Sequence, residues 1–147
     1  MPAPGSVPPE TVQTVEDSYR RCSQEAFLPA FYRRFLASDP AIPPRFAGTD
    51  FARQNKLLQH GIGLLFIYAK RRNPAILDRI AERHGPADLQ IEPRMYALFA
   101  ATLIETVREF DPQCTPAIEE AWRAALAPGI AFMIARSGQA IQTPADA

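Results

Sequence analysis

The sequence is short of the charge surplus, the cysteine and the histidine on which several classes of protein depend. Its sixteen Lys and Arg balance sixteen Asp and Glu, so no excess positive charge is available to release counterions from a phosphate backbone. Two cysteines are too few for a disulfide framework, and two histidines leave the ordinary zinc and hydrolase sites short of ligands. We therefore expect no nucleic-acid partner and a reducing, cytoplasmic location.

Long hydrophobic runs and targeting signals are also lacking. No uncharged apolar stretch approaches the roughly 20 residues that a membrane span requires. The N-terminus does not join a basic segment to an apolar one, as a secretory signal peptide does. Glycine-rich phosphate loops, Cys-x-x-Cys pairs, His-Glu-x-x-His helices and nucleophile elbows do not occur either. We expect neither a membrane partner nor any of the enzyme classes that those motifs mark.

What is present is the composition of one globular domain. The chain has 147 residues, 47% of them hydrophobic, and fifteen prolines that gather at the ends and between periodic segments. Prolines in such places delimit helices. Residues 1–9 are expected to form a disordered N-terminal tail and residues 139–147 a C-terminal tail, on either side of a domain over residues 10–138.

Within that domain, apolar residues recur at three- and four-residue spacing. Val12, Val15 and Tyr19 belong to one such stripe, and Phe27 and Phe31 begin the next. After a short turn-like segment, further helices are expected over about residues 51–69, 74–84, 92–110 and 115–137, with Pro, Gly, Asp or Thr at their ends. No alternating strand pattern competes with them. The sequence predicts an all-α fold of six or seven helices.

His84 is the residue on which chemistry could depend. It lies four residues after Ile80, at the end of a short expected helix and directly before the helix-ending Gly85. On position alone the favoured interpretation is structural, because a histidine at a helix C-terminus interacts with the helix dipole.

Several separated segments resemble one family, in the same order along the chain. They are the block Phe31–Phe46, the segment Gln54–Leu58, the segment Ile80–His84 with the Tyr96 that follows it, and the pair Ala121–Trp122. Together they resemble the globins, particularly the bacterial single-domain haemoglobins and the haem domain of flavohaemoglobins. The resemblance extends from about Glu10 to Ser137 and reverses the preference at His84 in favour of an iron ligand.

The resemblance implies a globin fold around haem b, with the iron ligated by His84. It also implies a distal pocket for a diatomic gas, made by Tyr32, Gln54 and Leu58. The residues implied to contact the haem are Phe46, Gln54, Leu58, Ile80, Arg83, His84 and Tyr96.

The chemistry of these residues agrees with those roles. The Gln54 amide and the Tyr32 hydroxyl can both donate a hydrogen bond to a partly negative oxygen. Leu58 and Ile62 share a helical face with Gln54, and that face can lie against a porphyrin. Without the resemblance, a half-buried tyrosine, a solvated glutamine and a core Phe46 would explain the same residues.

His60 is the other histidine and hence the other candidate ligand. It follows Gln54 by six residues, which rotates it by about 240° on a helix, so the two side chains cannot face the same side. Placing His60 in the distal position would leave twenty-four residues to His84, which is short for this family. We expect His60 on the surface or in helix packing.

The last expected helix departs from the bacterial pattern. Bacterial haemoglobins carry a Glu there that, with the tyrosine matching Tyr96, bears on the proximal histidine. Here no Asp or Glu lies between Trp122 and Pro144. Because carboxylates near a ligand tune its basicity, peroxidase-like chemistry is not expected.

The leading hypothesis is a protein that binds oxygen, carbon monoxide and nitric oxide reversibly on haem iron. One alternative is nitric oxide dioxygenation, which would need a separate reductase as a partner. Another is a gas or redox sensor, and a third is a globin relative that has lost haem. The expected oligomeric state is a monomer or a homodimer.

Overall fold

The structure is a computed structural model that describes residues 5–22, 25–78 and 92–146, with the side chains of the last helix described as far as Arg136. Its named helices are α1 (Pro9–Cys22), α2 (Phe27–Ala37), the 3-10 helix η1 (Pro43–Phe46), α3 (Phe51–Arg71), α5 (Pro93–Phe110) and α6 (Pro116–Asp146). The described residues contain no strand, which confirms the all-α prediction. None of the helices in the described ranges has the length and apolar character of a membrane span.

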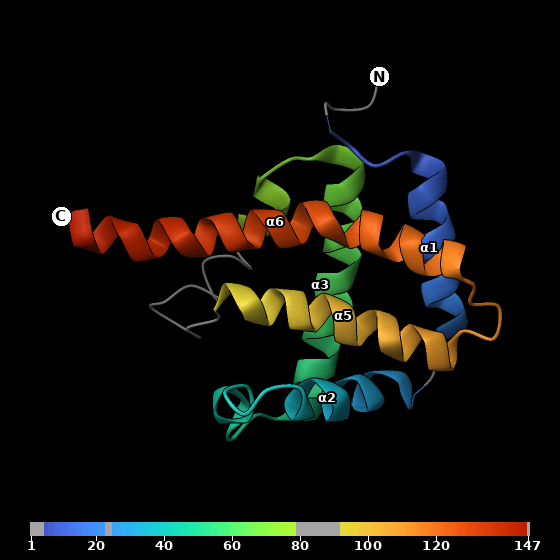
Figure 1. The fold of residues 1–147 in the computed structure, drawn as a ribbon, viewed down its shortest axis with the longest axis horizontal. Helices are drawn as coiled ribbons and strands as arrows, with labels where there is room; N and C mark the ends of the chain where they lie inside the picture. Colours follow the sequence, from blue (N-terminus) through green and yellow to red (C-terminus); the bar gives the residue numbers. More distant parts are fainter. Residues whose placement is uncertain (1–4, 23–24, 79–91, 147) are drawn as a thin grey trace.

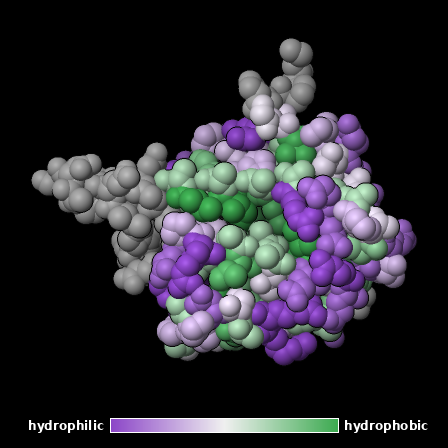
Figure 2. Space-filling view, in the orientation of Figure 1, coloured by the Kyte–Doolittle hydropathy of each residue, from purple (hydrophilic) through white to green (hydrophobic). Residues whose placement is uncertain are grey.

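The helices pack in crossed layers around α6. It contacts α1, α3 and α5, while α2 packs against α5. In Figure 1, α5 and α6 run in similar directions and α3 crosses them steeply. Figure 2 shows hydrophobic residues near the middle of the face in view and hydrophilic residues around its margins. The core therefore lies between the layers, where amphipathic helices bury their apolar faces against one another.

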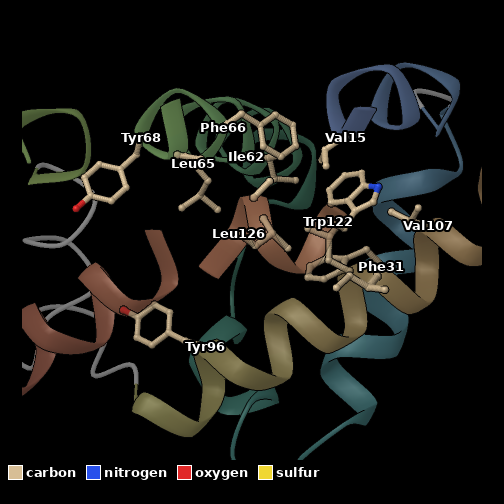
Figure 3. Packing of buried hydrophobic residues seen from close by; sticks show 14 of the residues in the cluster. Val15, Phe31, Ile62, Leu65, Phe66, Tyr68, Tyr96, Val107, Trp122 and Leu126 are labelled. Carbon is tan, nitrogen blue, oxygen red and sulfur yellow. The ribbon is translucent and has the colours of Figure 1, made fainter. Parts of the chain in front are cut away.

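Trp122 of α6 is the largest fully buried side chain. Figure 3 shows its ring among labelled side chains of the surrounding helices, including Val15 of α1 and Val107 of α5. Its centroid lies 5.6 Å from that of Phe66 and 6.1 Å from that of Tyr19, both in edge-to-face geometry. Such ring pairs add stabilisation to that of burial alone. Three helices, α1, α3 and α6, therefore meet at one indole.

A buried carboxylate secures the same region. Asp111, directly after α5, accepts hydrogen bonds from Ser18 Oγ at 2.6 Å and from Arg21 Nε at 2.6 Å and Nη2 at 2.9 Å. Ser18 Oγ in turn accepts a 2.9 Å hydrogen bond from Trp122 Nε1. Burial raises the pKa of the Asp111 carboxyl, but the hydrogen bonds from Arg21, Ser18 and the backbone N–H of Gln113 outweigh burial, so this pKa lies below its usual range. The carboxylate joins α1 to the connection between α5 and α6.

Gly129 allows α6 to approach α3 closely. A Cβ atom at this position would lie 2.4 Å from Cδ2 of Leu65 and 3.5 Å from Cδ1 of Leu77. Only a residue without a side chain fits this crossing without a shift of Leu65, which is itself buried.

The N-terminal segment differs from the expected tail. Val7 is buried, and its N–H donates a 2.9 Å hydrogen bond to the carbonyl of Ala69 near the end of α3. Arg72, with a left-handed φ of 57°, donates from Nη1 to the carbonyl of Gly5 at 2.7 Å. Residues 5–8 therefore pair their polar backbone groups with the end of α3, despite a proline content that suggests fraying.

Two helix ends also differ from expectation. α3 continues to Arg71 instead of ending near Ala69, and α6 continues to Asp146 through most of the expected 139–147 tail. Gly138 lies inside α6, where a glycine costs only about 1 kcal/mol relative to alanine and need not end a helix. Of the expected helix over 74–84, residues 75–78 are helical and residues 79–84 lie outside the described part.

Replacing Asp111 with Asn should lower the free energy of unfolding by about 1.5–3 kcal/mol, because the hydrogen bonds from Arg21 lose their charge assistance. The folded pKa of Asp111 is depressed, so its contribution is present above the unfolded pKa of about 3.9 and is lost as the pH falls through the folded pKa. Chemical denaturation should show the difference between variant and wild type narrowing below about pH 4.

The matched control is Glu120→Gln, which removes the partner of the exposed Arg123 ion pair. This variant should leave the denaturation midpoint nearly unchanged. Equal stability of wild type and Asp111→Asn at pH 7 would contradict the role given to the buried carboxylate.

Alanine at the two glycines of crossing helices should act in opposite directions. Gly129→Ala should destabilise the fold by about 1–2 kcal/mol, because the new methyl group displaces Leu65. Gly63→Ala should stabilise it by up to about 1 kcal/mol, since a Cβ at Gly63 meets nothing within 4 Å and alanine favours the helix. Thermal or chemical unfolding of both variants measures the signs, and the same sign for both would be the contrary result.

Candidate ligand-binding site

Tyr32 of α2 places a phenol hydroxyl inside the protein. α2 turns Phe27, Phe31 and Phe35 toward the core, and Tyr32 is buried beside them. Burial raises the pKa of Tyr32 to about 12, although a side-chain hydrogen bond with Gln54 of α3 acts in the opposite direction. At neutral pH this hydroxyl therefore keeps its proton and is available as a donor.

The start of α3 positions Gln54. Asp50 caps the helix, its side chain accepting from the backbone N–H of Ala52 at 3.1 Å and of Arg53 at 3.4 Å. The sequence allowed either Thr49 or Asp50 as the cap, and Asp50 fills that place. The N–H of Gln54 donates to the Asp50 carbonyl at 2.9 Å, which fixes the backbone of Gln54 in the first turn.

Three aromatic rings surround the Tyr32 side of this pair, and we call Tyr32, Phe46 and Phe51 the ring cluster. Tyr32 contacts Phe46 edge-to-face at 5.8 Å between centroids and Phe51 at 5.3 Å. Phe46 and Phe51 are stacked, with centroids 6.2 Å apart and ring planes inclined by 20°. The cluster joins α2, η1 and α3 through apolar contacts.

Ion pairs hold η1 against the start of α5. Arg45, which precedes Phe46, donates from Nη1 to the Ala41 carbonyl at 2.7 Å and from Nη2 to Glu92 at 3.2 Å. Arg94 pairs with both Glu92 and Asp39. The backbone N–H of Ala41 and the Arg94 guanidinium together hold the pKa of Asp39 below its usual value. These contacts set the place of Phe46 relative to α5.

The face of α3 that bears Gln54 is apolar beyond it. Leu58 is half-buried and Ile62 is fully buried, whereas His60 is exposed. The rotation predicted from the six-residue spacing is therefore confirmed, and His60 does not share the face of Gln54. The flanking cations Arg53 and Lys56 are exposed as well.

Tyr96, near the start of α5, is buried, and burial raises its pKa to about 12. Figure 3 shows it apart from the Trp122 region. The other implied contacts of the haem's proximal side, Ile80, Arg83 and His84, lie outside the described residues. The structure thus brings together Tyr32, Phe46 and Gln54 from separate elements, and Leu58 on the same face as Gln54.

Phe51 is the member of this site that was not predicted from the sequence. It was expected only as the first residue of the 51–69 helix. Its spacing contained the signal, because Phe51 precedes Gln54 by three residues and Leu58 by seven, so all three share one helical face. The stripe that begins at Gln54 could have been extended back by one turn.

The arrangement suits a small polar ligand above an apolar surface. Two side chains, a hydroxyl and an amide, converge beside the ring cluster and the half-buried Leu58. Within the described ranges no group of three or more His, Cys, Asp or Glu could hold a metal ion by itself. A metal at this site would therefore need a carrier that demands few protein ligands, as a porphyrin does.

One solved structure resembles the whole architecture. The chain is 36% identical to protein PA3967 from Pseudomonas aeruginosa PAO1, whose crystal structure is described as structurally highly homologous to a human haemoglobin. The match covers 86% of this chain and 98% of that chain, with a TM-score of 0.83. No protein-family model and no curated protein sequence matches the chain.

Proposed function

The chain belongs to the globin family, and on that premise we propose that it binds haem and, through the haem iron, oxygen and other diatomic gases reversibly. The observation that carries the proposal is the buried Tyr32 hydroxyl beside the Gln54 side chain. Burying polar groups is costly unless they are used, and hydrogen bonds to a small ligand would use both.

The described residues fit a haem. Phe46 and Leu58 are large apolar side chains that the protein alone leaves only partly buried, beside the polar pair. A porphyrin needs such an apolar surface, together with one strong axial ligand. We propose His84 as that ligand from its place in the sequence, with Ile80, Arg83 and Tyr96 as further contacts.

Haem supplies an iron that coordinates a gas molecule, and the protein supplies polarity and positioning. The Tyr32 hydroxyl and the Gln54 amide would each donate a hydrogen bond to a gas that carries partial negative charge. Oxygen accepts such bonds better than carbon monoxide does, so this pair would favour retention of oxygen. The two donors come from different helices, so their contributions can be tested separately.

Replacing His84 with Ala should abolish normal haem retention or replace the absorption spectrum with that of another ligand set. The wild-type protein, purified after expression with adequate haem, should show a Soret band. His60→Ala is the matched control, since it removes the other histidine, which is exposed, and should leave the spectrum unchanged. An unaltered spectrum in His84→Ala would refute the ligand assignment, and a wild-type chain that takes up no haem would refute the function.

Changing Tyr32 to Phe, or Gln54 to Leu, should speed oxygen dissociation. A hydrogen bond to a charged or polarised acceptor is worth about 1.5–3 kcal/mol, which is roughly a tenfold to a hundredfold change in an equilibrium constant. Carbon monoxide dissociation should change much less, and stopped-flow ligand replacement measures both rates. The control Gln59→Leu makes the same substitution at an exposed position of α3. Equal effects on the two gases would show that the pair does not act by hydrogen bonding.

A further inference from the structure

Phe51 is placed unusually for a large apolar side chain. It is 36% exposed, while the side chain that it contacts most closely, Tyr32, is only 5% exposed. Phe51 thus has one side in solvent and the other against the ring of the buried hydroxyl-bearing residue. A phenylalanine in this position separates the Tyr32 side chain from water.

The backbone below Phe51 is fixed, but its ring is held only by other rings. Asp50 caps α3 through its side chain, so the first turn itself is anchored. The ring contacts are the edge of Tyr32 and the stacked face of Phe46. Apolar contacts lack the directionality of hydrogen bonds, and no described side chain covers the outer side of the ring completely. Rotation of the Phe51 side chain into solvent therefore breaks two ring contacts and no hydrogen bond.

We propose that Phe51 is the gate residue of this site, so that a gas reaches the Tyr32–Gln54 pair when the Phe51 ring swings outward. The proposal rests on the proposed function, because it identifies the route to the same polar pair. In the structure the ring is in its closed position, stacked on Phe46 and against Tyr32.

The other hollow nearby is less suited to this role. A cavity of about 270 Å³ lies where the end of α1 and the start of α2 meet α3, with Leu28, Asn55 and Gln59 among its lining residues. Its lining includes neither member of the polar pair and no residue of η1. Passage beside Phe51 leads directly to Tyr32, whereas passage through the cavity would require displacement of Leu28 or Asn55.

A gate has a kinetic signature that differs from that of a hydrogen-bond donor. Lowering a barrier that a ligand crosses in both directions speeds association and dissociation by the same factor and leaves the equilibrium constant unchanged. Loss of a hydrogen bond from Tyr32 or Gln54 instead acts mainly on dissociation. The two roles can therefore be separated in one set of rate measurements.

The test compares Phe51→Ala with Phe51→Tyr, which keeps the ring, and with Leu57→Ala as a control. Leu57 is exposed to a similar degree, 41%, on the same helix. Carbon monoxide association after flash photolysis should be roughly two- to tenfold faster in Phe51→Ala, the range that corresponds to losing one or two ring contacts. Association should be near the wild-type rate in the other two variants, and carbon monoxide affinity should be unchanged in all three.

A second measurement does not depend on gas binding. Tyr32 can be labelled with fluorotyrosine in the purified protein, and its ¹⁹F resonance assigned by its loss in Tyr32→Phe. Phe51→Ala should then increase the broadening of this resonance by a soluble paramagnetic agent, whereas Leu57→Ala should not. A protein destabilised by the substitution would instead show broadening of the other three tyrosine resonances as well.

The outcomes separate the two proposals. If haem is bound and Phe51→Ala leaves both association and Tyr32 exposure unchanged, the gate is refuted while the proposed function stands. Faster dissociation with unchanged association would likewise refute the gate, because it would make Phe51 a part of ligand retention. If the wild-type chain takes up no haem, the proposed function fails and the gate fails with it.

Discussion

The buried carboxylate of Asp111 is the constraint on which the rest of the fold depends. Its hydrogen bonds reach Ser18 and Arg21 of α1, and through Ser18 the indole of Trp122 on α6. A buried charge is tolerable only while its donors stay in place, so this network fixes α1 and α6 relative to the end of α5. Trp122 then orients α3 through Phe66, and α3 presents Gln54 to the site. The position of the polar pair thus depends on a corner of the molecule that takes no part in it.

Much of the helical architecture could be predicted from local signals. Pro93 and Pro116 begin α5 and α6 because a proline at the first helical turn loses no hydrogen bond, and Asp50 begins α3 because its carboxylate caps free N–H groups. The ends were harder to predict, since α6 passes through Gly138 and residues 5–8 dock on α3. A helix end depends on what the neighbouring chain offers its last carbonyl groups, and local sequence does not contain that information.

The candidate site divides in the same way. Helical spacing alone places Gln54 and Leu58 on one face and His60 on another, because rotation per residue is a local property. The approach of Tyr32 to Gln54 and the ring contacts of Phe51 with Phe46 join separate elements, and only the packed structure reveals them. The Asp111 network is the extreme case, since Ser18 and Asp111 are 93 residues apart. No pattern in the sequence marks a serine and an aspartate at such a separation as partners.

The two ends of α5 use different forces, and the difference suits a protein that must be firm and yet admit a ligand. At its C-terminal end, charge-assisted hydrogen bonds hold Asp111, and breaking any of them strands a buried polar group. At its N-terminal end, the pairs of Arg45 and Arg94 hold η1 from the outside, while the ring cluster beyond them is joined by stacking and edge contacts. Directional bonds resist displacement, whereas aromatic contacts can be exchanged for one another at modest cost. A site placed at the second end can therefore open by moving one ring while the core at the first end stays packed.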